Sequence, residues 1–219
     1  MTWIADLALI EPEGQRIIEI GQGAPAATVP QYPTWTLRDL VVHVAGVHGR
    51  TAEICRTLPR ERIPTTELPS GRDAFGWAAE QLAAMLGGLR TADPDAATWT
   101  FVADPCLRFW GPRMVVETGV HRWDAESAIG NPQPLPAEVA VHGLDEFSEL
   151  YLPRLGGVPA IELVAIDLGH RWRYGAGTPV ATVEGTASDL FLRLMSRPGA
   201  ALPIEWERAV DALASPADR

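Results

Sequence analysis

Apolar residues recur every three or four positions through the first 130 residues, which is the spacing of amphipathic helices. This pattern predicts four helices, over residues 3–20, 37–58, 70–90 and 112–129. Pro12 and Gly14 fall inside the first segment, so we expect it to be helical in two pieces. Four such helices joined by mixed loops indicate an up-and-down bundle, with or without crossover connections.

The second predicted helix has the clearest beginning. Thr36 is a suitable N-cap, and Asp39 three residues later forms a near-capping box with it. Trp35 before the cap and Leu40 after it fit a hydrophobic staple. His43 follows on the second turn, so it lies close to the apolar stripe of this helix.

Segments rich in Gly, Pro and Thr separate these helices and predict loops over residues 21–33, 59–69 and 91–111. The last of them carries four aromatic residues, Trp99, Phe101, Phe109 and Trp110. Loops of this length are often functional. The alternative, which we favour, is that the aromatic side chains close the end of the bundle.

The pattern changes after residue 132. One more helix is predicted over 136–152, then three strands over 160–167, 170–174 and 180–184. A helix capped by Thr186 or Ser188 and another over 204–214 follow. We therefore predict an α+β protein with two domains, a helical bundle over 1–132 and a small α+β domain over 133–219.

Composition and charge limit the classes of molecule that this protein is expected to bind. The chain has 219 residues, of which 47% are hydrophobic and 21% charged, as in ordinary globular proteins. The net charge of −10 argues against nucleic acid and anionic membranes as partners. We find no run of 18 apolar residues and no basic, apolar leader, so we expect a cytoplasmic protein that acts on small molecules.

All 18 basic residues are arginines, which excludes a lysine Schiff base and a P-loop lysine. The two cysteines, Cys55 and Cys106, form no CxxC pair and no disulfide framework. We expect reduced thiols, with Cys55 inert in the apolar surroundings of its helix. The chain thus offers few nucleophiles of its own.

One Glu–His pair stands out on the fourth predicted helix. Glu117 and His121 are four residues apart, so they share a face at a separation of about 6 Å. His43 is the best third ligand, whereas His48 points about 140° away from it. Two imidazoles and a carboxylate suit Zn²⁺ with one open position, and also suit other divalent ions. By spacing alone, a solvated helix pair and a core histidine are the commoner outcomes.

Other polar residues near this pair have two interpretations each. Asp39 either orients the histidine one turn later or caps the helix, and we favour the cap. Arg113 and Arg122 are candidates for clamping a substrate carboxylate, although exposed salt bridges are the commoner outcome. Asp124 and Glu126 are expected to be solvated or paired with Arg122.

Two stretches, Trp35-Thr-Leu-Arg-Asp-Leu-Val-Val-His43 and Glu117-Thr-Gly-Val-His121-Arg-Trp-Asp-Ala-Glu126, resemble the mycothiol-dependent maleylpyruvate isomerase family, part of the wider DinB-like metal-binding bundles. Residues 141–147 and 183–190 resemble that family's C-terminal domain, whose fold is related to sterol-carrier-like domains. The resemblance implies that His43, Glu117 and His121 hold the family's divalent metal.

Two departures from the family's pattern bear on the substrate and leave the three ligands in place. Relatives commonly carry a histidine where this chain has Val116. They also carry Cys-Pro-Gly-Trp where this chain has Tyr32-Pro33-Thr34-Trp35.

The resemblance implies an actinobacterial enzyme, monomeric or homodimeric, with Zn²⁺ as the expected metal and mycothiol as cosubstrate. The thiol would occupy the open metal position as a thiolate, its nucleophilic form, and add to a small electrophile. Release of the thiol would give isomerisation, and its retention would give S-transfer. Two alternatives stay open: a hydrolase that uses metal-bound water with Asp124 or Asp39 as base, and a non-enzymatic protein that binds a small ligand.

Overall fold

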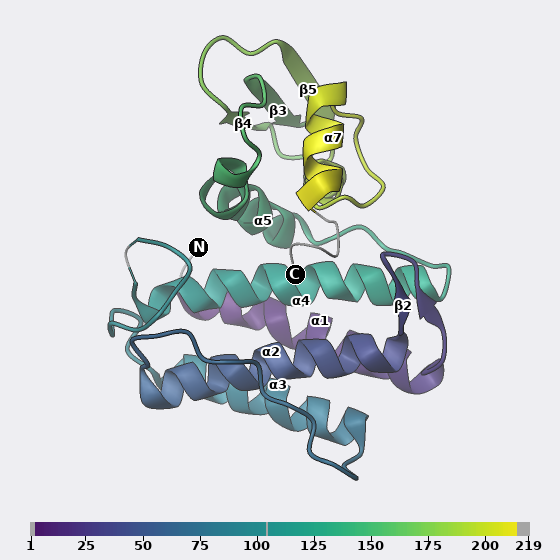
Figure 1. Cartoon of the computed structure of the whole chain (residues 1–219), viewed down its shortest axis with the longest axis vertical. Coiled ribbons are helices and arrows are strands. Elements are labelled where there is room, and N and C mark those ends of the chain that lie inside the picture. Colours follow the sequence, from purple (N-terminus) through teal and green to yellow (C-terminus); the bar gives the residue numbers. More distant parts are fainter. Residues whose placement is uncertain (1–2, 104, 214–219) are drawn as a thin grey trace. The chain divides into compact units, whose positions relative to one another are not determined.

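The computed structural model of the chain describes residues 3–103 and 105–213. Two compact units are distinguished by their internal contacts, Met1–Gln133 and Pro134–Arg219. The first unit is helical and the second combines helices with a small sheet (Figure 1), so the predicted α+β fold class is confirmed. In the described part of the chain, no helix is long and apolar enough to cross a membrane.

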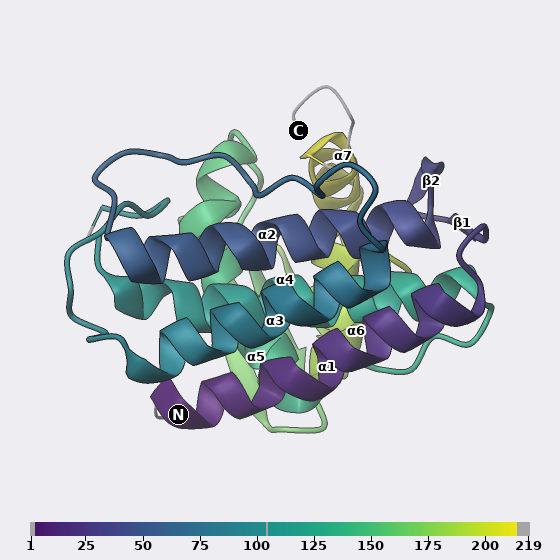
Figure 2. The same ribbon diagram turned by 90° about the horizontal axis from the view of Figure 1, so that it is seen from below.

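The first unit is the predicted four-helix bundle. Its helices are α1 (Trp3–Gly23), α2 (Leu37–Thr57), α3 (Ala74–Thr91) and α4 (Trp110–Ala128). Helix α2 packs against α3 and α4, and α1 packs against α4 and α3. Figure 2 shows the four helices lying side by side along their length. The apolar stripes predicted from the sequence meet in the middle of this bundle.

Helix α1 is continuous through Pro12, so the predicted division into two pieces is wrong. Pro12 is exposed, and apolar residues on both sides of it are buried, which holds the helix together across the missing N–H. Gly14 has a packing role instead, because a Cβ at this position would lie 2.8 Å from Leu82 Cδ2. This glycine allows α1 and α3 to approach closely.

The segment predicted as a loop over 21–33 is partly regular. Helix α1 continues to Gly23, and β1 (Thr28–Val29) pairs antiparallel with β2 (Tyr32–Thr36). Strand β1 has only two residues, and no residue of β2 is buried, so neither strand shows a two-residue alternation of apolar and polar positions. The ribbon leads into α2, where Thr36 and Asp39 form the predicted capping box, complete on both sides.

Helix α3 begins at Ala74, four residues later than the predicted start at Ser70. Gly71 has a positive φ of 76°, which a helix does not accommodate. Asp73 is therefore the N-cap itself, and its carboxylate accepts a hydrogen bond from Gly76 N at 2.7 Å.

Helix α4 begins at Trp110, two residues before the predicted start at Pro112, and follows a 3-10 turn over Leu107–Phe109. Its end is as predicted, because Gly130 has a positive φ of 73° just beyond it. Nearly every side chain from Met114 to Glu126 is buried, charged residues included. Helix α4 therefore contributes buried polar side chains to the interior of the bundle as well as apolar ones.

The second unit contains α5 (Ala137–Leu150), a 3-10 turn over Leu152–Arg154, β3 (Ile161–Ala165), β4 (His170–Tyr174), β5 (Ala181–Gly185), α6 (Ala187–Leu194) and α7 (Ile204–Leu213). Strand β3 lies between β4, its antiparallel partner, and β5, its parallel partner. Thr186 caps α6, as one of the two alternatives predicted. The predicted end of α7 at residue 214 lies outside the described residues.

Candidate metal centre

Two side-chain contacts set the register of α2 against α4. His48 Nε2 lies 2.9 Å from Thr118 Oγ1, and Thr51 Oγ1 donates to Met114 Sδ at 3.3 Å. Higher numbers on α2 meet lower numbers on α4, so the two helices are antiparallel. This register brings His43, five residues before His48, opposite the Glu117–His121 stretch of α4.

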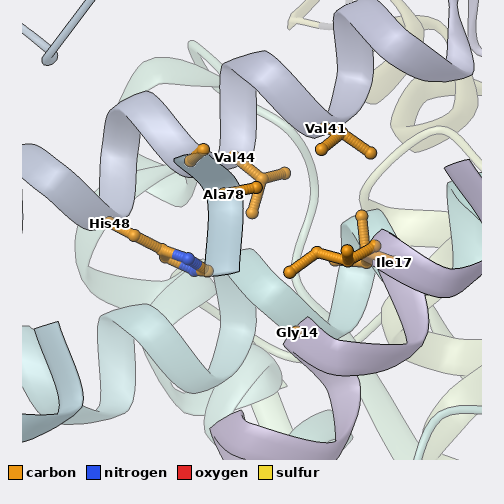
Figure 3. Close-up of a pocket in the computed structure, with 8 residues that line it drawn as sticks. Gly14, Ile17, Val41, Val44, His48 and Ala78 are labelled. Carbon is orange, nitrogen blue, oxygen red and sulfur yellow. The ribbon is translucent and has the colours of Figure 1, made fainter. Parts of the chain in front are cut away.

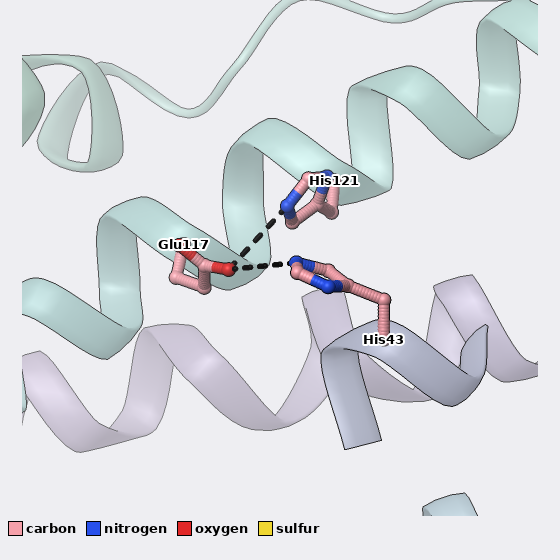
Figure 4. Close-up of side chains that lie close together, drawn as sticks. All are labelled: His43, Glu117 and His121. Atoms are coloured by element: carbon pink, nitrogen blue, oxygen red, sulfur yellow. Dashed lines mark ion pairs between the residues drawn. The ribbon is translucent and has the colours of Figure 1, made fainter. Parts of the chain in front are cut away.

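The structure brings His43, Glu117 and His121 together. His43 Nε2 lies 3.6 Å from Glu117 Oε1, and His121 Nε2 lies 3.4 Å from the same oxygen (Figure 4). One ligand atom from each residue lies within 4.8 Å of the other two. Among residues 3–103 and 105–213 no other cluster of three His, Cys, Asp or Glu side chains meets this criterion. The three sequence-predicted ligands therefore form one cluster, with donor atoms of the kind that first-row divalent metals bind.

Asp124 supports this cluster from behind. It is fully buried, and its carboxylate lies 3.0 Å from His121 Nδ1. Burial alone would lower the pKa of His121, but the hydrogen bonds to Asp124 and Glu117 outweigh it and raise the pKa to about 10. Asp124 was expected to be solvated or paired with Arg122, and the expected solvation is wrong. Side chains three residues apart on a helix are neighbours whether the face is exposed or buried, so the spacing did not decide between the two.

Arg113 holds the other oxygen of the central carboxylate. Its guanidinium donates to Glu117 Oε2, which leaves Oε1 facing the two histidines. Burial would raise the pKa of Glu117, but Arg113 and the two histidines hold it well below its usual range. The Arg113 side chain is only 15% exposed, so the expectation of an exposed salt bridge is wrong.

Two aromatic side chains from β2 border the histidines. Tyr32 and Trp35 stack with ring centroids 4.7 Å apart, and Trp35 lies 5.0 Å from the His43 ring. Tyr32 lies 6.0 Å from the His121 ring. The family comparison of Tyr32–Trp35 pointed to this segment, but hydrophobic periodicity did not, because the ribbon that carries Tyr32 was not predicted. His43, whose side chain is 37% exposed, is the ligand candidate most open to solvent.

The remaining sequence candidates have other partners. Asp39 accepts hydrogen bonds from Thr36 N and Oγ1, so the favoured capping role is confirmed. Arg122 donates to Glu13, Glu126 and the Gln133 carbonyl, deep within the bundle. The predicted pairing with Glu126 is confirmed, and the expected exposure of Arg122 is wrong.

His48 and the aromatic connection before α4 contribute to the core. Burial lowers the pKa of His48 to about 4, so this imidazole is neutral beside Thr118. Trp99, Phe101, Phe109 and Trp110 form a ring cluster with centroid distances of 4.9–5.9 Å. Trp110 is fully buried, which supports the packing interpretation of this segment.

A small cavity lies in the bundle interior near His48 (Figure 3). Its volume is about 10 Å³, and its walls come from Gly14, Ile17, Ile18, Val41, Val44, Ala45, His48 and Ala78. This volume holds about one water molecule, so the cavity is too small for a substrate.

Comparison with known proteins gives the family. The sequence profile of the mycothiol maleylpyruvate isomerase N-terminal domain matches residues 16–126, more than half of the chain, and includes all three clustered residues. No curated protein sequence matches significantly. A crystal structure of the mycothiol-dependent maleylpyruvate isomerase, and one of a histidine-to-alanine mutant of it, each match with a TM-score of 0.67 at 13% identity. Each match covers 93% of this chain and 95% of the other, so the fold is shared across both units. The chain therefore belongs to the mycothiol maleylpyruvate isomerase family.

Proposed function

We propose that this protein is a metal-dependent enzyme that uses a small thiol, mycothiol, to act on a small electrophile as an isomerase or S-transferase. Family membership supports an enzyme of the isomerase kind. The observation that carries the proposal is the convergence of His43, Glu117 and His121 on one point between α2 and α4.

The residues present fit a divalent metal. His43 Nε2, His121 Nε2 and Glu117 Oε1 would hold it, and this set of two imidazoles and one carboxylate suits Zn²⁺. A bound metal of this kind lowers the pKa of a coordinated thiol and so supplies a thiolate at neutral pH.

The chain's own residues prepare the site. Asp124 orients the His121 ring through Nδ1, and Arg113 fixes the Glu117 carboxylate. Tyr32 and Trp35 border the two histidine rings from the ribbon side. The His43 side chain stays 37% exposed, which leaves the cluster open to a small thiol.

A borrowed thiol fits the chain's lack of a suitable nucleophile. Neither described cysteine belongs to the cluster, and burial raises the pKa of the Cys55 thiol to about 12. The hydrolase alternative lacks its base, because Asp124 is occupied by His121 and Asp39 by the helix cap.

Titration of the metal-loaded protein with mycothiol tests the proposal. We expect binding by calorimetry that His43→Ala abolishes and that His170→Ala, at an exposed histidine of β4, leaves unchanged. A maleyl-type electrophile should then turn over only when the thiol is present. Unchanged thiol binding in His43→Ala would exclude thiol coordination here, and turnover with water alone would favour the hydrolase. Absence of stoichiometric metal in the purified protein would exclude both the thiol-dependent enzyme and the hydrolase.

We also propose that residues 1–132 and 133–219 are separate domains and that the first alone binds the metal. A Cβ at Gly143 would lie 2.3 Å from the Phe191 ring, so Gly143→Leu should disrupt the core of the second unit. Metal affinity of the full-length variant should be unchanged, and a large loss would contradict the assignment.

A further inference from the structure

Among the residues that the structure describes, Arg50 on α2 is a buried cation without an anionic partner. The residue is 8% exposed, and its Nε is buried without a hydrogen-bond partner. Its guanidinium carbon lies 5.6 Å from the centre of the Trp110 ring, a cation–π contact. Within the described part of the chain, no ion pair or hydrogen bond involves this guanidinium. Proteins almost never bury an arginine fully unless an anion accompanies it.

The position of Arg50 connects it to the candidate metal centre. It follows His43 by seven residues, about two turns along nearly the same face of α2. On the antiparallel helix α4, Arg113 precedes Glu117 by one turn. Both arginines therefore lie toward the Trp110 end of the contact between α2 and α4, beside the cluster rather than within it.

The carboxylate nearest to Arg50 already has other partners. The charged groups that act on Arg50 are Glu117, Arg113 and Arg62. The only carboxylate among these three already accepts from Arg113 and faces two histidines. An anion that enters from solution would give the Arg50 guanidinium the partner that the described residues do not supply.

We propose that Arg50 binds a carboxylate group of the substrate next to the metal centre. The inference rests on the proposed function, and what it adds is the residue that would hold the substrate's carboxylate. The Arg50 guanidinium carbon lies over the Trp110 ring. A guanidinium presents parallel N–H groups that match a planar carboxylate bidentately.

The free protein keeps Arg50 at a cost in stability. Replacement of an unpaired buried charge by an apolar side chain of similar size is neutral or stabilising. Arg50→Met should therefore raise the melting temperature of the ligand-free protein while it weakens anion binding. An arginine with a purely structural role would behave in the opposite way. Arg56→Met is the matched control, because Arg56 lies on the same helix, is exposed and pairs with Glu53.

The probe is maleate, a small dicarboxylate, titrated into the full-length protein with and without metal and followed by NMR. Arg50→Met should weaken maleate binding about tenfold or more in both forms, the loss expected for a charge-assisted pair. Arg56→Met should bind as the wild type does. Dimethyl maleate, which carries no charge, should bind equally to all three proteins.

Several outcomes would overturn the proposal. Unchanged maleate affinity in Arg50→Met would do so, as would an equal loss for dimethyl maleate or a stronger response to inorganic phosphate than to maleate. The proposed function fails separately. If mycothiol does not bind but maleate binding depends on Arg50, the subsite stands without the reaction. If mycothiol binds through His43 and maleate affinity does not depend on Arg50, the proposed reaction is retained and the subsite is rejected.

Discussion

His121 Nδ1 lies 3.0 Å from the carboxylate of Asp124, which solvent does not reach. Contacts of this kind fix the ring of a metal-binding histidine and raise its basicity. We expect Asp124→Asn to weaken metal binding by about tenfold to a hundredfold, because the amide keeps the shape and loses the charge. Competition with a chromophoric chelator measures this loss directly.

Asp39→Asn is the control for that variant, since Asp39 also precedes a ligand candidate but caps α2 through Thr36. It should lower the free energy of unfolding by up to about 1 kcal/mol and leave metal affinity unchanged. Equal losses of metal affinity in the two variants would argue that Asp124 acts through general stability and not through His121.

Metal binding should release a proton from His121. The pKa of about 10 means that the metal-free ring is protonated at pH 7, and Nε2 must lose its proton to bind a metal. Metal affinity should therefore rise with pH until the ring is neutral near pH 10. Calorimetry in two buffers of different ionisation enthalpy counts the protons. Release should fall in Asp124→Asn, and the absence of any release in the wild type would contradict the protonation state.

His48 predicts a loss of stability in acid. Its pKa is about 4 in the folded protein, against an ordinary value of 6.5 for histidine, so the unfolded chain binds a proton that the folded chain excludes. The stabilising contribution is complete above pH 6.5 and is lost as the pH falls toward 4, by up to about 3 kcal/mol. Urea unfolding with a chelator present should show this slope.

His48→Gln keeps a polar side chain beside Thr118 and removes the titrating ring. Between about pH 7 and about pH 4.5, the free energy of unfolding of His48→Gln should change less than that of the wild type. Parallel pH profiles for the two proteins would show that other groups cause the acid sensitivity.

Arg122 is predicted to stabilise the bundle and not to bind substrate. Its guanidinium donates to Glu13 and Glu126, and all three side chains are largely buried. Arg122→Met should cost about 3–5 kcal/mol in the free energy of unfolding, because two carboxylates lose their partner. The folded fraction should retain maleate affinity. Recovery of part of the stability in the double variant with Glu126→Gln would identify the ion pair as the cause.

The sequence was informative where a local rule decides the structure. The capping box at Thr36 and Asp39 and the terminator Gly130 are local, and the structure has both. Glu117 and His121 were paired by helix periodicity, and the choice of His43 as their partner needed the family resemblance as well. Their metal-binding role stays a prediction.

Tertiary burial decided the rest. Asp124 and Arg122 were expected in contact with solvent, yet α4 is enclosed on nearly all sides, which periodicity cannot show for a helix whose polar residues are buried. In the ribbon that carries Tyr32, β1 has two residues and β2 has no buried position, so no alternation of apolar and polar residues marks them. Arg50 has no sequence signal, because only the fold shows that an arginine lacks an anion.

The His48–Thr118 contact joins residues 70 positions apart, and the ligand candidates on the same two helices are equally remote in sequence. Helix α4 alone offers Glu117 and His121, so no continuous segment of the chain presents the full set. An ion held by this set would bind only where α2 is docked on α4. It would therefore stabilise the folded bundle over every state in which the two helices are apart, and a chelator would remove that stabilisation.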